Sequence, residues 1–238
     1  MSIKSKILAP TIVIILAVAV AIMVTNIVLF SNFVDASTIN SVNEATNVVI
    51  NNLDLLKTDA QAVSLIVAGN PAIIGAVESG NRAELLANAR TLQDRSGIDF
   101  CTISDSAGTV IARTHDPENF GDSISSHATV QAAMHGQSLS VIEEGTVVRL
   151  GIRAGAPILD EQGAVIGIVS VGFRLDTDTF VDSIKQMMGC EVTIVLGDER
   201  ISTTVFDENG TRIVGTKSDA NIVETVLSGN YYSGRVDI

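Results

Sequence analysis

The sequence has no tryptophan, two cysteines and few basic residues, and each shortage excludes a class of protein. Aromatic residues make up 4% of the 238 residues, which disfavours stacking platforms for bases or sugars. Lys and Arg total 15 against 27 Asp and Glu, a formal net charge of −12. No basic cluster compensates locally, so no nucleic-acid partner is expected. The two cysteines are too few for a disulfide framework and lack zinc-site spacing.

Charged residues are also absent from positions 7–30, a run rich in Ile, Val, Leu and Ala. As a helix at ~1.5 Å per residue this run would be about 36 Å long, enough to cross a ~30 Å hydrocarbon core. A cleavable signal peptide is the alternative, but its apolar region is only ~7–15 residues long and ends at a small-residue cleavage site. We therefore predict a retained transmembrane helix at 7–30. Lys4 and Lys6 favour a cytoplasmic N-terminus (1–6). The helix would then anchor the chain in the cell membrane, with the residues that follow it outside the cytoplasm.

Residues 31–70 are predicted to form one long stalk helix that continues from the membrane. Its apolar positions recur at spacings of four and three; they are Val42, Thr46, Val49, Leu53, Leu56, Ala60, Val63 and Val67. Such a seam either forms a coiled-coil homodimer or packs along the domain that the helix carries, and the sequence leaves both open. Gly69-Asn70-Pro71 ends the helix, and a second helix is predicted at 72–95.

From Ile98 onward, short segments rich in Val, Ile and Thr alternate with turn signals, which indicates antiparallel strands. An Asp-x-x-Gly turn between two such segments occurs three times, at 105–108, 160–163 and 207–210. Asp at the first position and Gly at the fourth suit a type I turn in a hairpin. A calcium loop is the alternative, but the spaced acidic ligands and the closing Glu of such a loop are absent.

The remaining elements are predicted in order along the chain. They are a helix at 126–135, strands at 138–144 and 147–157, a strand at 164–173 that is apolar on both faces, a helix at 177–188 closed by Gly189, and then a second set with strands from 191, a helix at 219–227 and a strand at 232–237. A strand that is apolar on both faces belongs in the centre of a sheet. The second set lacks a closing hairpin, so it is predicted to be incomplete.

Three segments resemble the Cache sensory domains of bacterial and archaeal receptors. Residues 112–123 (ARTHDPENFGDS) are similar to the segment after strand two of the Cache 3 type, and 153–160 (RAGAPILD) with 163–167 (GAVIG) to its closing hairpin. Residues 200–204 (RISTT) and 210–216 (GTRIVGT) are similar to the start of a Cache 2-like unit in the fused double form. The resemblance implies an α+β fold with a PAS-like antiparallel five-stranded sheet. It implies a membrane-distal first module at 71–176, and a connecting helix with a truncated second module at 177–238.

Strand alternation places Arg113 and His115 on one face, and Arg149, Gly151 and Arg153 on one face of a later strand. Arginine forks bind carboxylates in bidentate geometry, and a glycine allows close approach of a ligand to the backbone. These positions are therefore candidates for an anion site. The alternative from spacing alone is an exposed face whose arginines are solvated or paired with acidic residues.

The resemblance adds roles for particular residues. In carboxylate-sensing relatives, an Arg and a His after strand two and basic residues on strand four bind the ligand, and the matching positions here are Arg113, His115 and Arg153. Ser170 matches a ligand-facing hydroxyl, whereas Arg149 rests on spacing alone. The amino-acid-binding Cache subgroup uses a Trp, which this sequence lacks. A small carboxylate is thus the expected ligand, and His115 would make its binding sensitive to pH.

The other notable side chains are predicted to be structural. His127 and His135 are eight positions apart on a short helix, unlike a zinc pair at i, i+4, so both are expected at the surface. Cys101 and Cys190 are expected to be free and buried, although an extracytoplasmic disulfide is possible in principle. No nucleophile–base arrangement, metal motif or phosphate loop occurs, so neither enzyme activity nor a cofactor is expected.

Members of this family usually continue into a second membrane span and a cytoplasmic signalling part, as in methyl-accepting chemotaxis proteins and sensor histidine kinases. The sequence therefore predicts the extracytoplasmic ligand-sensing region of a chemoreceptor. The sensor region of a histidine kinase is the first alternative. A ligand-free, membrane-anchored module for dimerisation or docking is the second.

Overall fold

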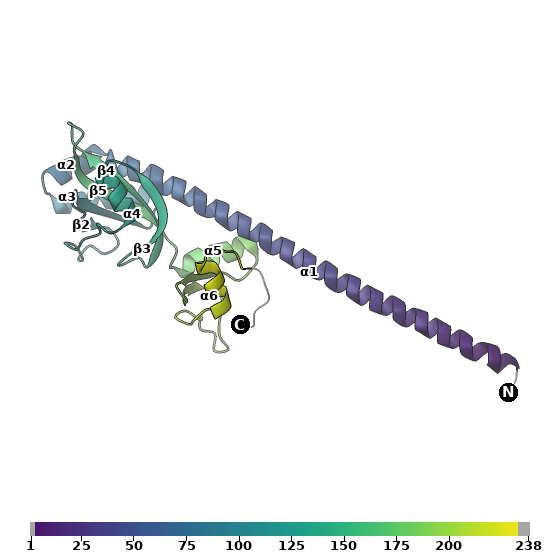
Figure 1. The fold of residues 1–238 in the computed structure, drawn as a ribbon. Coiled ribbons are helices and arrows are strands. Elements are labelled where there is room, and N and C mark those ends of the chain that lie inside the picture. The colour runs from purple at the N-terminus through teal and green to yellow at the C-terminus, as the bar shows by residue number, and fades with distance from the viewer. Residues whose placement is uncertain (1–2, 233–238) are drawn as a thin grey trace. The chain divides into compact units, whose positions relative to one another are not determined.

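The computed structural model describes residues 3–232, except for the side chains of 3–15, 17, 32, 35–41 and 43. It divides into two compact units, Met1–Val48 and Val49–Ile238. The strand predicted at 232–237 falls almost entirely outside the described residues. Helices and one five-stranded antiparallel sheet make up most of the second unit (Figure 1), which confirms the predicted α+β class.

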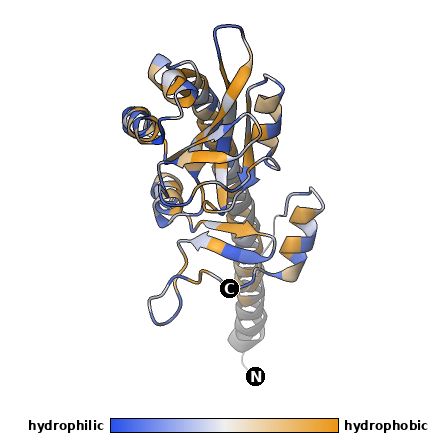
Figure 2. Cartoon of the chain, turned by 90° about the vertical axis from the view of Figure 1, so that its left-hand side faces the viewer, coloured by the Kyte–Doolittle hydropathy of each residue, from blue (hydrophilic) through white to orange (hydrophobic). Residues whose placement is uncertain are grey.

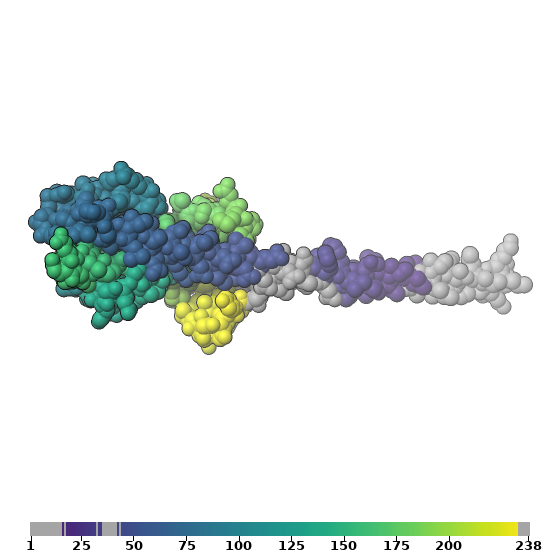
Figure 3. Space-filling view, turned by 90° about the horizontal axis from the view of Figure 1, so that it is seen from above, coloured from purple at the N-terminus to yellow at the C-terminus, as the bar shows by residue number. Residues whose placement is uncertain are grey.

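The first helix, α1, runs without a break from Ile3 to Ala68. Within it, the apolar stretch Val18–Ser31 (purple in Figure 3) exposes its described large side chains, including Phe30 at 70%. In the described part of the chain, no single helix is both long and apolar enough to cross a membrane; one bent pair, Glu44–Ala68 with Pro71–Glu78 at 58°, meets the length and composition test. The span at 7–30 includes side chains that are not described, so it stays a prediction.

The later half of the apolar seam of α1 packs in the main core of the unit to which it belongs, Val49–Ile238. Ala60 and Val67 are buried in the main core, and Leu53, Leu56 and Val63 pack against it. This part therefore follows the intramolecular alternative. Further toward the start, Val42 and Thr46 are exposed, and a homodimer through this helix stays a prediction.

The single helix predicted at 72–95 is wrong, because two helices occupy this region. They are α2, Pro71–Glu78, and α3, Arg82–Ser96. Between them Gly80 has a φ of 65°, a conformation that ends a helix and is open mainly to glycine. Asn81 then caps α3 by accepting a hydrogen bond from the backbone N–H of Glu84. A polar Asn after a glycine was a signal for this break.

The main sheet has the order β2-β1-β5-β4-β3, and all its pairs are antiparallel. Its strands are β1 Phe100–Asp105, β2 Val110–Arg113, β3 Leu139–Glu144, β4 Leu150–Leu159 and β5 Val165–Arg174. The central place of β5 confirms the prediction made from its two apolar faces. Hydrophobic residues dominate this sheet (orange in Figure 2).

The two faces of the sheet are covered differently. One face packs against α1, α2 and α3 to form the main core. On the opposite face the short helix α4, Ala128–Met134, buries Val130 and Ala133 in a smaller core with Ile168 of β5. Because α4 covers only part of this face, room is left beside it for polar side chains.

All three Asp-x-x-Gly turns form, and the first two join hairpins as predicted. In each, the glycine N–H donates to the aspartate carbonyl at 3.0–3.1 Å, and the φ of Gly108, Gly163 and Gly210 is 77–83°. The aspartate carboxylate also accepts backbone N–H groups from within the turn. The third turn differs only in that a single bridge, Phe206–Arg212, takes the place of a hairpin.

Beyond the sheet the chain forms α5 Asp178–Met188, β6 Thr193–Leu196, β7 Glu199–Thr203 and α6 Ala220–Leu227. Strands β6 and β7 pair as a two-stranded sheet. Gly189 ends α5 with a φ of 67°, as predicted, and Thr177 caps its start. Both cysteines are free, but only Cys101 is buried; burial of Cys190 was a wrong prediction, because it lies in the turn just after α5.

Candidate ligand-binding site

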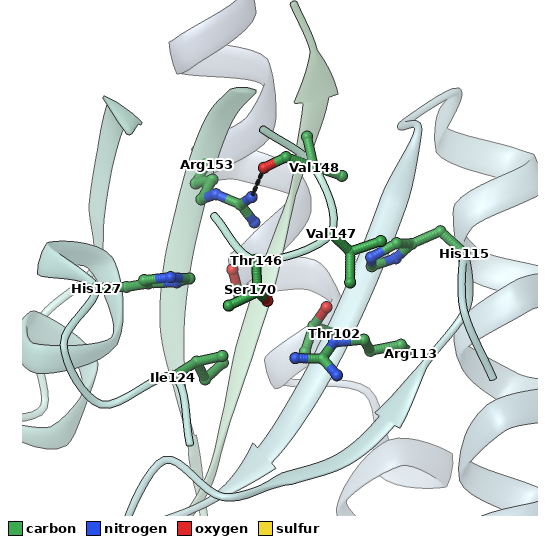
Figure 4. Close-up of a pocket in the computed structure, with 10 residues that line it drawn as sticks. All are labelled: Thr102, Arg113, His115, Ile124, His127, Thr146, Val147, Val148, Arg153 and Ser170. Carbon is green, nitrogen blue, oxygen red and sulfur yellow. Dashed lines mark hydrogen bonds between the residues drawn. The ribbon is translucent and has the colours of Figure 1, made fainter. Parts of the chain in front are cut away.

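A row of polar side chains crosses the sheet on the face that carries α4. Thr102 of β1 lies opposite Arg113 of β2 on one side and opposite Ser170 of β5 on the other. Gly155 of β4 continues the row, and Arg153 lies two residues along the same strand. Because cross-strand partners and alternate residues share a face, these side chains point to one side of the sheet (Figure 4).

These side chains form the floor of a pocket that two loops complete. The lining residues are Thr102, Arg113, His115, Ile124, His127, Thr146, Val147, Val148, Arg153 and Ser170. Figure 4 shows His127 and His115 on opposite sides, with Thr146 and Ser170 between them. The cavity volume is about 10 Å³, which is about the minimum for one water molecule. The free space within the pocket is therefore small.

Unpaired polar atoms concentrate in this pocket. Among the described residues, six buried side-chain nitrogen or oxygen atoms have no hydrogen-bond partner within the protein. Four of the six line this one pocket: His115 Nδ1, His127 Nδ1, Arg153 Nε and Ser170 Oγ. A buried polar group without a partner costs ~1–3 kcal/mol. Such a cluster indicates a site whose partners come from outside the chain.

Arg153 is the central cation of the pocket. It is 5% exposed, and burial lowers the pKa of its guanidinium. Its Nη2 donates to the carbonyl oxygen of Val148 at 2.9 Å, and the guanidinium carbon lies 4.9 Å from the ring centre of Phe100. It has no carboxylate partner among the described residues. Its charge is therefore available to a ligand.

Arg113 is buried more deeply but is already paired. Its two terminal nitrogens donate to both carboxylate oxygens of Asp122, at 2.7 and 2.6 Å. One of them also donates to the carbonyl oxygen of Asn119 at 2.9 Å. The hydrogen bond from Arg113 keeps the pKa of Asp122 below its ordinary value. The Asp122 charge thus offsets the charge of Arg113.

His115 is half-buried and neutral at neutral pH. Burial, reinforced by Arg113 and Arg153, lowers its pKa from 6.5 to about 4. Its ring meets Phe100 edge to face, with 5.6 Å between the centroids. A neutral imidazole can still donate one hydrogen bond, so His115 contributes a polar contact here rather than a charge.

His127 corrects the expectation of a surface histidine. It lies at the N-cap of α4, its side chain makes no capping hydrogen bond, and it lines the pocket. Burial lowers its pKa. The spacing of eight residues between His127 and His135 argued only against a zinc pair. It could not show that the fold brings His127 to the pocket. His135 is exposed, as predicted.

The prediction that Arg149 shares a strand face with Gly151 and Arg153 is wrong. It precedes β4, which begins at Leu150, so strand alternation does not extend to it. Its guanidinium makes two hydrogen bonds to the Glu199 carboxylate, at 3.0 and 2.9 Å, and is 46% exposed. Arg113, His115, Arg153 and Ser170 therefore come together in one pocket, and Arg149 lies outside it.

No cluster of three or more His, Cys, Asp or Glu suited to a metal ion occurs among the described residues. The pocket instead offers a guanidinium, two neutral imidazoles and hydroxyl groups. These are hydrogen-bond donors around one cation. Such a set binds an acceptor-rich anion.

The lowered pKa of His115 predicts a loss of stability in acid. The unfolded chain binds a proton at the ordinary pKa of 6.5, whereas the folded chain does so only near pH 4. The free energy of unfolding should therefore fall as the pH drops from 6.5 to 4, by about 1–2 kcal/mol after allowance for solvent screening. Urea unfolding at pH 7 and pH 4.5, compared with His115→Gln, measures this. An equal acid loss in the variant would contradict it.

Comparisons with known proteins identify the family of this chain. A family model described as single Cache domain 3 matches residues 55–188, and a second of the same description matches 174–238. The sensor histidine kinase DpiB of Escherichia coli (strain K12) is 31% identical over 109 residues, 45% of this chain and 19% of DpiB. The sensor histidine kinase CitA of Klebsiella pneumoniae is 26% identical over 110 residues, 46% of this chain and 20% of CitA.

This chain thus aligns with about one fifth of the length of these two kinases. Among solved structures, the sensor domain of the Vibrio cholerae histidine kinase DctB is similar in fold, with a TM-score of 0.53 at 13% identity, covering 81% of this chain and 74% of that one. The first family match alone takes in more than half of the sequence. The chain therefore belongs to the single Cache domain 3 family of sensory domains.

Proposed function

We propose that this chain is the extracytoplasmic sensing region of a membrane-bound histidine kinase and that it binds a small carboxylate in the Arg153 pocket. The observation that carries the proposal is the cluster of four unpaired buried polar atoms around one cation. A carboxylate has about four lone-pair sites and a negative charge. It therefore matches both the donors and the charge that the pocket leaves unused.

The donors differ in the bonds they can make. Arg153 supplies an N–H at Nε and the ionic part of the interaction, and charge-assisted hydrogen bonds are roughly twice as strong as neutral ones. Ser170 supplies a hydroxyl from the central strand. His115 and His127 face the pocket from its two sides (Figure 4) and can each offer an N–H without adding charge.

Binding requires the loop at 145–149 to move. Three of its residues line the pocket, and the Val148 carbonyl holds Arg153. A Cβ on Gly145 would overlap Arg153 Nη2, so the loop lies directly against the guanidinium. With only about 10 Å³ free, a carboxylate needs space that the loop residues now fill. In this proposal, the loop at 145–149 occupies part of the space that the ligand would take.

The moving loop is tied to the start of the second module. The backbone N–H of Arg149 donates to Asp176 at 2.9 Å, and its side chain pairs with Glu199 of β7. Asp176 follows β5 and precedes α5. Displacement of the loop would thus strain contacts on the path to α5. A ligand shifts this balance only by the difference in its affinity for the open and closed states.

The output assignment rests on the two relatives matched by sequence, since both are sensor histidine kinases. Neither of these two relatives is a chemoreceptor, so the chemoreceptor output that the sequence first favoured stays a prediction. The transmembrane helix at 7–30, the cytoplasmic N-terminus and dimerisation through α1 are parts of the same proposal. They supply the route by which a ligand outside would affect a kinase inside.

Thermal unfolding of the full chain in detergent with a panel of carboxylates tests the function. A carboxylate present at ~100 times its dissociation constant should add about 2.7 kcal/mol to the free energy of unfolding. The matched amides, which have the same shape without the charge, should add none. If no carboxylate in the panel raises the melting temperature, the ligand-free anchored module becomes the better explanation.

A further inference from the structure

Only one of the two pocket arginines has a free charge. Arg113 is matched to both oxygens of Asp122, an arrangement that cancels one positive charge with one negative charge. Arg153 donates only to the neutral carbonyl of Val148. Counting arginines from the sequence therefore overstates the positive charge that a ligand meets.

The neighbouring charges supply no second cation. Glu143 of β3 accepts hydrogen bonds from the N–H of Ala128 at 3.0 Å and from the hydroxyl of Thr129 at 2.6 Å, at the start of α4. Arg174 is paired with Asp176 at 2.9 Å. Asp116 and Glu143 add negative potential near His115 and Arg153, respectively. Both histidines have lowered pKa values and are neutral at pH 7.

We infer that the pocket selects a carboxylate carrying a single negative charge, and that Asp122 is the residue that sets this selectivity. The inference rests on the proposed function. One carboxylate would take the charge of Arg153 and the free donors around it. A second carboxylate on the same small ligand would find no unpaired cation among the described residues that line the pocket, because Asp122 already pairs with Arg113.

The cost of that second charge comes from burial as well as repulsion. Removing a carboxylate from water without a paired cation is strongly unfavourable, and like charges a few ångströms apart add to the penalty. The small cavity points the same way, because it leaves little room for water around a second carboxylate. We expect a monocarboxylate to bind at least ~10-fold more tightly than a dicarboxylate of equal length.

A matched pair of ligands tests this on the unaltered chain. Succinate and monomethyl succinate have the same backbone but carry two charges and one charge at pH 7.5. Calorimetric titration of the full chain in detergent should show tighter binding of the monoester, and propionate gives a second single-charge probe. Equal or tighter binding of succinate would overturn the inference and leave the carboxylate function intact. Failure of all three, together with the wider panel, would overturn the proposed function itself.

Asp122→Asn then tests the role of the residue. The amide keeps the shape of the side chain but frees the charge of Arg113, so succinate should gain ~10-fold or more relative to the monoester. The double variant Arg113→Gln with Asp122→Asn restores the original charge and should restore the original preference. The control variant Asp198→Asn removes an exposed carboxylate paired with Lys217. It should change neither the affinity for succinate nor the affinity for the monoester. An unchanged preference in folded Asp122→Asn would contradict the assignment.

Discussion

Replacing Arg153 with methionine should weaken carboxylate binding by at least ~100-fold while leaving the melting temperature of the ligand-free protein within a few degrees of its original value. Arg153 is 5% exposed, carries the free charge of the pocket and has an unpaired Nε. Truncating one partner of a buried charge pair typically costs ~2–5 kcal/mol of binding free energy. Calorimetric titration with the tightest monocarboxylate measures the loss.

The ligand-free protein should tolerate this change because Arg153 is poorly satisfied before a ligand binds. Methionine is shorter but flexible and apolar, and its thioether can pack near Phe100 without an unpaired donor. The substitution does leave the Val148 carbonyl without its partner, which offsets part of the gain. Lost binding with retained stability is the expected pattern for a residue that acts on the ligand rather than on the fold.

Arg149→Met is the matched control for Arg153→Met. It removes an arginine four positions earlier whose guanidinium is exposed and paired with Glu199. Because exposed ion pairs contribute ~0–1 kcal/mol, stability should change little, and carboxylate affinity should change by no more than about fivefold. A loss at Arg149 as large as that at Arg153 would show that the loop, rather than the pocket, dominates binding.

Features governed by short-range chemistry could be predicted from the sequence. The three Asp-x-x-Gly turns formed because each aspartate accepts N–H groups of its own turn. Alternation correctly placed Gly151 and Arg153 on one face of a strand, because a side chain within a strand must point to one side or the other. The same rule failed at Arg149 because β4 begins one residue later. Strand ends are set by neighbouring strands, which a local pattern does not contain.

Other parts of the site depend on contacts between distant segments. His127 enters the pocket because α4, which it precedes, packs on the sheet, and the loop at 145–149 covers Arg153 by its path through space. Asp122 lies nine residues after Arg113 in an irregular segment, and nothing in the spacing indicates that the two pair. The candidate cations could therefore be predicted, whereas the net charge offered to a ligand could not.

Gly172→Ala should unfold the domain or cost more than ~4 kcal/mol of stability. Gly172 lies on β5 opposite Arg153 of β4. A Cβ there would overlap the backbone carbonyl oxygen of Ile152 and come within 3.0 Å of the Phe100 ring. Because the obstacle is backbone in the neighbouring strand, no rotamer change relieves it, and β4 and β5 must separate. Urea unfolding followed by circular dichroism measures the loss.

Gly75→Ala makes the same chemical change and should have the opposite sign. Gly75 lies in α2, and a Cβ there would have no atom within 4 Å. Alanine is favoured over glycine inside a helix by ~0.5–1 kcal/mol, so this variant should be slightly more stable. A mild effect at Gly172 would mean that β4 and β5 can move apart readily.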